Sequence, residues 1–426
     1  MTVPGTTTSC SDVVKVLLIV SSALLARPAT GEVPTPSLFP LQERWSTDLQ
    51  QSALFPPVYD NEQAYVALRD GTLAAVSLVD GSITWSAERL TQVSPTVGDG
   101  LVVVADEGIL LALRTTDGAV MWSTNLGAAV TAPLVWNGGW LVAALQDGNV
   151  VILRGADGLE LWRHPVLGQL DVRPSVGGRE LFLPVRDGRV LAFDLETGEL
   201  LWERLLGGSP QEILPLDDLF VGATDNYFYR LSRADGKMRW RWRTGGDIVG
   251  RSVVDERRVM FVSLDNILWA LDRDSGVLQW RRPLVGRPTA GPQVVAEMAL
   301  VSGVSPILRA FDTRDGREAG ALTGPGEFFG PAHVLRTPAL LAPGLIVMTG
   351  DGHLVSLLQP TGPPQFSLDF PPPPLLPAPK RLELDYILPL PLILTAEALP
   401  WSIGSDVLIT PTHPDDARVS DPSESP

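Results

Sequence analysis

The sequence has few of the residues on which catalytic and metal sites commonly depend. Among 426 residues there is one cysteine, Cys10, and there are four histidines, His164, His333, His353 and His413. A single thiol excludes a disulfide framework and any site built from several cysteine ligands. No two histidines stand at the spacing of metal ligands, so we expect no bound metal.

Positive charge and long helical patterns are also scarce. The chain has 33 lysines and arginines against 49 acidic residues, which makes the formal net charge −16. Non-specific binding to nucleic acid or anionic lipid needs a basic surface, so we expect no nucleic-acid partner. Long amphipathic helical patterns are absent, whereas 40 glycines and 38 prolines favour a turn-rich β fold.

No apolar run reaches the ~20 residues of a transmembrane helix, so we expect no transmembrane segment. A shorter run, 16–26, follows Lys15 and precedes the small residues Ala29-Thr30-Gly31, a pattern typical of a secretory signal. We therefore predict a signal peptide at 1–31 and an exported protein of the periplasm or cell envelope. Cys10 precedes the run, so it is not placed to receive a lipid after cleavage.

What the sequence does contain is an eleven-residue frame that returns eight times. Its clearest copy runs from Ala192 to Trp202, with a small residue first, Gly198 seventh and tryptophan last. The copies are 75–85, 112–122, 152–162, 192–202, 230–240, 270–280, 310–320 and 356–366. The seventh-position glycines are Gly81, Gly118, Gly158, Gly198, Gly236 and Gly276, and the eleventh-position tryptophans are Trp85, Trp122, Trp162, Trp202, Trp240 and Trp280.

Each frame has the pattern of two strands joined by a tight turn, because Asp-Gly or Thr-Gly lies between alternating apolar residues. A second turn signal precedes it, as at Asp70-Gly71, and an earlier proline such as Pro57 indicates the entry to the innermost strand. A repeat of ~40 residues with four strands is the size of a propeller blade. The sequence thus predicts an all-β, eight-bladed β-propeller of four-stranded antiparallel blades at 43–370.

The ends of the propeller leave one question open. Trp45, in the stretch 43–49, resembles the end of a frame that has lost its first half. Such an N-terminal strand often completes the last blade of a propeller and protects its edge. The competing candidate for the closing strand is the weak frame that ends at Phe366.

The remaining segments are rich in proline or polar residues. Residues 32–42 form a Pro-rich lead-in, and four prolines at 371–374 begin a second Pro-rich segment. We expect 371–412 to be a C-terminal extension that packs on the propeller, and 413–426 to be a disordered tail.

The frame Ala-x-Asp-x-x-Thr-Gly-x-x-x-Trp resembles the tryptophan-docking motif of pyrroloquinoline-quinone-type β-propeller repeats, over residues ~45 to 366. The resemblance implies that the tryptophan of one blade packs against the small residue and the turn peptide of a neighbouring blade. The six tryptophans and six glycines of the frames would then be structural docking residues. Truncating such a tryptophan to alanine should cost ~3–5 kcal/mol.

That family contains both quinoprotein dehydrogenases and non-catalytic scaffolds. The dehydrogenases look like longer chains with a calcium site, a catalytic aspartate and often a pair of adjacent cysteines, and this chain has no cysteine pair. It is more similar to the scaffold that serves outer-membrane β-barrel assembly. The resemblance therefore implies a non-catalytic, monomeric protein without cofactor that binds a protein partner in the cell envelope. The alternative is a quinone-dependent oxidoreductase or a ligand-binding quinoprotein-like protein.

Two groups of residues are candidates for partner binding. Residues 230–287 hold thirteen basic and seven acidic residues, and within them Arg239, Arg241 and Arg243 alternate with tryptophans. On a strand these three guanidinia share one face, which fits an acidic partner. The alternative is a solvated outer face on which the arginine stems cover apolar surface.

The second group is the pair Phe328 and Phe329, which lies in a Gly/Pro-rich insertion of the last unit. Insertions in repeat proteins often reach a functional face, so both rings are candidates for an exposed binding element. The alternative is a loop that folds both rings onto the propeller, because exposed apolar patches without a partner are uncommon.

Overall fold

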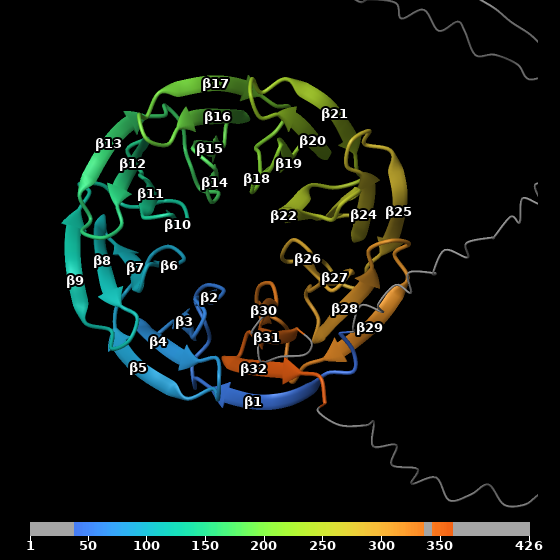
Figure 1. Cartoon of the computed structure of the whole chain (residues 1–426), viewed down its shortest axis with the longest axis horizontal. Coiled ribbons are helices and arrows are strands. Elements are labelled where there is room, and N and C mark those ends of the chain that lie inside the picture. Colours follow the sequence, from blue (N-terminus) through green and yellow to red (C-terminus); the bar gives the residue numbers. More distant parts are fainter. Residues whose placement is uncertain (1–37, 336–342, 361–426) are drawn as a thin grey trace, which may run out of the picture. The chain divides into compact units, whose positions relative to one another are not determined.

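The computed structural model describes residues 38–335 and 343–360, which form eight four-stranded antiparallel sheets arranged in a ring (Figure 1). This confirms the predicted eight-bladed β-propeller. The chain divides into two units, 1–364 and 365–426, and all described residues belong to the first. The predicted signal peptide, C-terminal extension, disordered tail and Phe366 lie outside the described residues.

Each blade runs from an innermost to an outermost strand (Figure 1). The innermost strands are β2 (Val58–Tyr59), β6 (Thr96–Gly98), β10 (Val135–Asn137), β14 (Ser175–Gly177), β18 (Leu214–Pro215), β22 (Ile248–Val254), β26 (Gln293–Val295) and β30 (His333–Leu335). The second strands are β3 (Gln63–Ala67), β7 (Leu101–Asp106), β11 (Trp140–Ala144), β15 (Glu180–Pro184), β19 (Asp218–Gly222), β23 (Arg258–Ser263), β27 (Met298–Val301) and β31 (Gly344–Met348).

The two outer positions of each blade contain the frames. The third strands are β4 (Thr72–Ser77), β8 (Ile109–Arg114), β12 (Asn149–Arg154), β16 (Arg189–Asp194), β20 (Tyr227–Ser232), β24 (Ile267–Asp272), β28 (Ile307–Asp312) and β32 (His353–Leu358). The outermost strands are β5 (Ile83–Glu88), β9 (Val120–Asn125), β13 (Glu160–Pro165), β17 (Leu200–Leu205), β21 (Met238–Arg243), β25 (Leu278–Pro283), β29 (Glu318–Thr323) and β1 (Gln42–Asp48).

The register of each blade follows the frame. The first frame residue pairs with the eleventh, as in Ala192 with Trp202, and the ladder shifts by one residue immediately afterwards. The turn between them needs a glycine, because Gly198 adopts φ 73°. The frame is therefore a hairpin whose bulge fixes where its tryptophan stands.

The eighth blade is completed by the other end of the propeller. Strand β1 is the outermost strand of this blade and pairs antiparallel with β32. Trp45 faces Ser356, the first residue of the eighth frame, with the same register shift beside it as in the other blades. The N-terminal candidate therefore occupies the closing position, in the register that the frame dictates.

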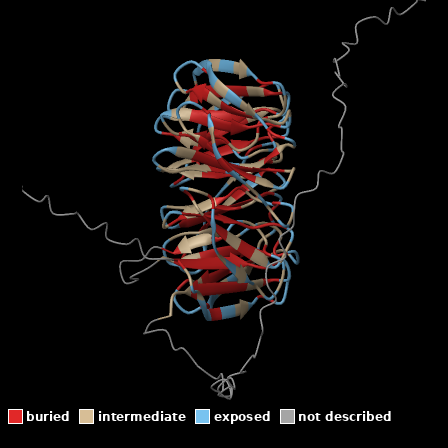
Figure 2. Cartoon of the chain, turned by 90° about the vertical axis from the view of Figure 1, so that its right-hand side faces the viewer, coloured by how far each residue is buried: buried red, intermediate tan, exposed pale blue. Residues whose placement is uncertain are grey.

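The hydrophobic core lies between the blades, in their second and third strands. Strand β15, for example, has four consecutive buried residues from Leu181 to Pro184, whereas most residues of β17 are exposed. Figure 2 shows the same division, with buried segments inside the ring and exposed ones at its rim. Because both faces of each inner strand meet a neighbouring blade, these strands are continuous apolar runs rather than alternating ones.

The part of the chain that the structure describes includes no helix with the length and apolar character required to cross a membrane.

Candidate functional site

The frame tryptophans connect neighbouring blades. The ring of Trp162 lies against Gly198 of the next blade, where an added Cβ would stand 2.8 Å from it. The indole Nε1 of Trp162 donates to the carbonyl of Leu195 at 2.9 Å. Trp162 thus contacts both the turn glycine, which is the seventh residue of the frame, and the turn peptide of the next blade.

Most other tryptophans make the same two contacts. The rings of Trp85, Trp122, Trp202, Trp240 and Trp280 lie against Gly118, Gly158, Gly236, Gly276 and Gly316, respectively. Indole donation to a turn carbonyl joins Trp85 to Thr115, Trp122 to Gly155, Trp202 to Arg233 and Trp280 to Thr313. The remaining predicted glycine, Gly81, receives Trp45 of the closing strand. These contacts connect neighbouring blades around the ring.

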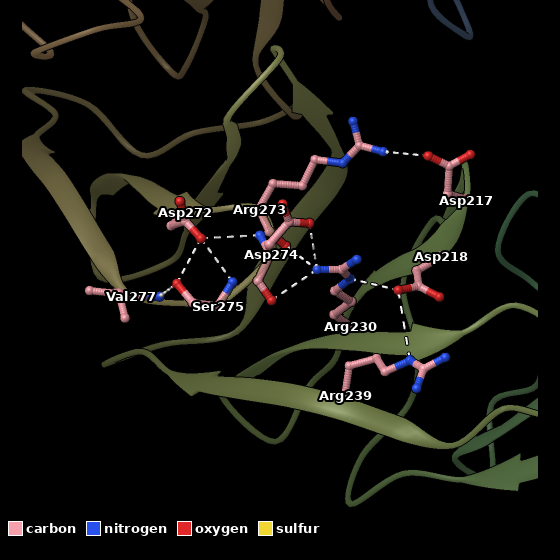
Figure 3. A network of polar contacts seen from close by, with 9 residues as sticks. All are labelled: Asp217, Asp218, Arg230, Arg239, Asp272, Arg273, Asp274, Ser275 and Val277. Atoms are coloured by element: carbon pink, nitrogen blue, oxygen red, sulfur yellow. Dashed lines mark hydrogen bonds and ion pairs between the residues drawn. The ribbon is translucent and has the colours of Figure 1, made fainter.

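Trp240 departs from this pattern, because its indole N–H is buried without a partner. The first residue of its frame is Arg230, where most other frames have alanine. Arg230 donates to the carbonyls of Arg273 and Asp274 at 2.7 and 2.9 Å, and to a carboxylate oxygen of Asp218 at 2.7 Å (Figure 3). An ionic clamp thus replaces the indole hydrogen bond between these two blades.

The seventh blade lacks a tryptophan at its eleventh position, which is Gly320. The ring of Phe39, from the lead-in, fills the space beside this glycine, with ring atoms 2.7 Å from where a Cβ would stand. Leu38 is fully buried in the same region. Sequence reasoning missed this contact, although a glycine in the tryptophan position indicated that another group must fill the space.

The three candidate arginines lie on β21, the outermost strand of the fifth blade. Arg239, Arg241 and Arg243 are all exposed, and the two tryptophans between them are partly buried. The Arg241 guanidinium lies 4.6 Å from the centre of the Tyr227 ring, and Arg239 lies 3.9 Å from Asp218. Their alternation on one face of an edge strand is therefore present in the structure.

Phe328 does not present its ring at the surface, which corrects its selection as an exposed binding residue. It is 5% exposed, belongs to a buried cluster and forms an isolated bridge with Thr349. Phe329 is partly buried against a neighbouring cluster and donates its main-chain N–H to Met348. The loop folds both rings onto the propeller, which is the alternative considered above, because burying them removes apolar area from water.

His333 lies on the innermost strand of the eighth blade, where its ring is partly buried. Its ring stacks on Tyr59 with centroids 3.8 Å apart, joining the innermost strands of the eighth and first blades. Burial lowers the pKa of His333 to about 4, and burial also raises the pKa of Tyr59. Both groups are therefore neutral at neutral pH.

Within 38–335 and 343–360, no cluster of three or more histidine, cysteine, aspartate or glutamate side chains is arranged to hold a metal ion. The Asp-Gly pairs occur one to a hairpin. In these turns the aspartate accepts main-chain N–H groups, as Asp147 does from Asn149 at 3.0 Å. This is the ordinary chemistry of a turn.

Solved structures with the same fold include a BamB and a quinoprotein. The structure of BamB from Moraxella catarrhalis superposes with a TM-score of 0.63 at 17% identity, covering 75% of this chain and 100% of that chain. Quinohemoprotein alcohol dehydrogenase from Comamonas testosteroni superposes with a TM-score of 0.64 at 11% identity, covering 78% of this chain and 79% of the other. At these identities the likeness concerns the fold alone.

Several proteins that resemble this chain in sequence are BamB proteins. Outer membrane protein assembly factor BamB of Legionella pneumophila (strain Paris) is 24% identical over 185 residues, which are 40% of this chain and 46% of that protein. The chain spans less than half the length of the first curated relatives it matches. The profile of the family described as outer membrane protein assembly factor BamB matches residues 42–133, 118–218, 186–327 and 250–363, more than half of the chain, and the protein belongs to this family.

Proposed function

We propose that this protein is a non-catalytic scaffold that binds other proteins during the assembly of outer-membrane proteins. The observation that carries the proposal is the match of the BamB family over the whole propeller, from residue 42 to 363. The described docking residues support it, because the frame tryptophans and glycines join blades to one another. A rigid ring of this kind offers a wide surface on which partners can be positioned.

Export is part of the proposal. The apolar run 16–26 after Lys15 supports a cleaved secretory signal and a place in the periplasm or cell envelope. Mass spectrometry of the mature protein should find an N-terminus near Glu32 without lipid, and sedimentation should find a monomer. An intact Met1 in a cytoplasmic fraction would contradict this part of the proposal.

The surface that we assign to an acidic protein partner is the arginine row of β21. Arg239, Arg241 and Arg243 extend from an edge strand that no other strand within 38–335 and 343–360 covers, and the Arg239 side chain is 56% exposed. The chain as a whole carries −16, so a local positive row distinguishes this side of the ring for an approaching partner. The guanidinium of Arg241 lies above the Tyr227 ring, and this contact already restricts the side chain. Arg241 therefore loses less conformational entropy when a partner binds.

The test is affinity capture from an envelope extract, followed by association kinetics with the captured partner. The variant Arg239→Glu/Arg241→Glu/Arg243→Glu should slow association, most strongly at low salt, and should melt as the wild type does. The control reverses Arg114, Arg154 and Arg314, which are exposed arginines on three other blades. Equal association rates of both variants and the wild type would remove this surface from the proposal.

The oxidoreductase alternative makes an opposite prediction, and the shared fold of the quinohemoprotein alcohol dehydrogenase is the observation in its favour. For a scaffold, incubation with pyrroloquinoline quinone and calcium should produce neither bound-cofactor absorbance nor dye-linked alcohol or sugar oxidation. Stoichiometric binding of the cofactor together with turnover would contradict the proposal of a non-catalytic scaffold.

A further inference from the structure

A cavity of about 400 Å³ opens between the third and fourth blades. It lies where the hairpins β10–β11 and β14–β15 meet the turn that precedes β17, on neighbouring blades of Figure 1. Its lining residues are Asn137, Gly138, Trp140, Gly178, Arg179, Leu195 and Glu196. The volume is within the range of about 300–1,000 Å³ that small-molecule sites occupy.

At the corresponding position between the fifth and sixth blades, an arginine bridges the boundary. Trp140 and Asp218 are each the first residue of a second strand, and each pairs with the third residue of its frame. Asp218 holds Arg230, which reaches the carbonyls of the next blade's turn (Figure 3). Between the third and fourth blades the frame begins with Ile152, whose apolar side chain cannot form such an ionic bridge.

An arginine also bridges the boundary between the fourth and fifth blades. Glu180, again the first residue of a second strand, binds Arg233, which also donates to the carbonyls of Gly177 and Leu216. Glu180 and Asp218 are the two acidic residues that begin a second strand, and an arginine bridges each of their boundaries. At the boundary beside Trp140 this position carries an aromatic ring, and a cavity remains.

The lining contains one aromatic ring and two side chains whose hydrogen-bonding groups have no partner. Trp140 is partly buried against a core cluster, and neither its indole N–H nor the side-chain amide of Asn137 has a partner among the described residues. Asn137 and Trp140 flank a two-residue turn, Gly138-Gly139, in which both glycines have positive φ, so the hairpin holds the two side chains at adjacent places.

Charge at the rim is balanced. Arg179 and Glu196 form an ion pair whose side chains are 74% and 58% exposed. An exposed ion pair of this kind is weak, so both groups are available to a ligand. The paired charges carry no net charge, which favours a neutral ligand with many hydroxyl groups over an anion or a cation.

We propose that this cavity binds a pyranose unit of a neutral glycan. The C–H face of a pyranose ring is apolar and weakly positive, which suits the negative face of the Trp140 indole. Its hydroxyl groups are matched by Asn137, which both donates and accepts, by the donor Arg179 and by the acceptor Glu196. A proline-rich peptide suits the site less well, since such peptides dock in grooves lined by several aromatic rings, and Trp140 is the single ring here.

The test uses the full-length protein labelled with ¹⁵N and titrated separately with cellotetraose, maltotetraose, chitotetraose and a proline-rich peptide. At least one oligosaccharide should shift the indole N–H signal of Trp140, assigned from Trp140→Phe, with millimolar affinity typical of weak binding. Asn137→Ala and Trp140→Ala should weaken that binding, Trp140→Ala by roughly tenfold or more. Leu161→Ala, an exposed apolar truncation on β13 of the same blade, is the matched control and should bind as the wild type does.

Three results would overturn the proposal. They are the absence of any shift with all three sugars at about 10 mM, a shift with the peptide alone, and undiminished sugar binding by a folded Trp140→Ala variant. If Trp140→Ala fails to fold, the indole titration of the wild-type protein still decides between sugar, peptide and no ligand.

Discussion

The guanidinium of Arg230 donates to the carbonyl of Arg273 at 2.7 Å, where the docking pattern assigns the indole N–H of Trp240. Trp162 and Trp280 each donate to the carbonyl 33 residues further along the chain. Arg273 stands at that place relative to Trp240, yet the Trp240 N–H remains buried and unpaired. Two ways of joining blades therefore coexist in one ring.

We expect Arg230→Ala to destabilise the protein by about 2–3 kcal/mol, because it leaves Asp218, only 12% exposed, without its main partner. Asp218→Ala should cost a similar amount. The double variant should lose less than the sum of the two changes, because neither charge is then left unpaired. Urea unfolding followed by tryptophan fluorescence measures this, and additive losses would contradict the clamp.

Replacing tryptophan by phenylalanine separates the ring contact from the hydrogen bond. Trp162→Phe should cost about 1 kcal/mol more than Trp240→Phe, because only Trp162 loses an indole donation, to Leu195. Both variants keep most of the apolar contact with the docking glycine. Matched thermal and urea unfolding curves provide the comparison, and equal losses would show that the indole bond contributes nothing.

The lead-in is expected to stabilise the seventh blade. Phe39→Ala should cost up to about 3 kcal/mol, since the partly buried ring that fills the space beside Gly320 is removed. Phe39→Leu, which keeps most of the apolar volume, should lose less than half as much. If Phe39→Ala has the melting temperature of the wild type, the ring of Phe39 does not stabilise the seventh blade.

His333 should make the protein less stable as pH falls. Its pKa is about 4 when folded and near 6.5 when unfolded, so the unfolded chain binds more protons between these values. Stability is full above pH 6.5 and declines toward pH 4, by no more than about 3 kcal/mol. His333→Phe should flatten that slope, whereas the control His164→Gln, on an outer strand, should keep it; parallel slopes in all three proteins would contradict this assignment.

The fold could be predicted from the frame because the features that determine each hairpin lie within eleven consecutive residues. Alternation, an Asp-Gly or Thr-Gly turn and a tryptophan at the eleventh place determine a hairpin whose tryptophan meets the next blade, as Trp162 meets Gly198. The exposure of Arg241 between the partly buried Trp240 and Trp242 is equally local, since side chains alternate along a strand.

What could not be predicted depends on contacts between distant segments. Trp45 and Phe366 both suited the closing position, and only the pairing of β1 with β32 distinguishes them. Phe39 fills a gap left some 280 residues later in the chain, and no periodicity connects it to Gly320. The cavity beside Trp140 likewise appears only when the registers of two blades are compared.

The pairing of β1 with β32 has a consequence for the order of events in synthesis. Trp45 emerges early and Ser356 late, so the eighth blade cannot acquire its outer strand until nearly the whole described propeller has been made. Contacts so distant in sequence make folding slow, and an unpaired apolar segment is open to mispairing while it waits. Closure of the ring by β1 and β32 is therefore among the last steps in the folding of the described propeller.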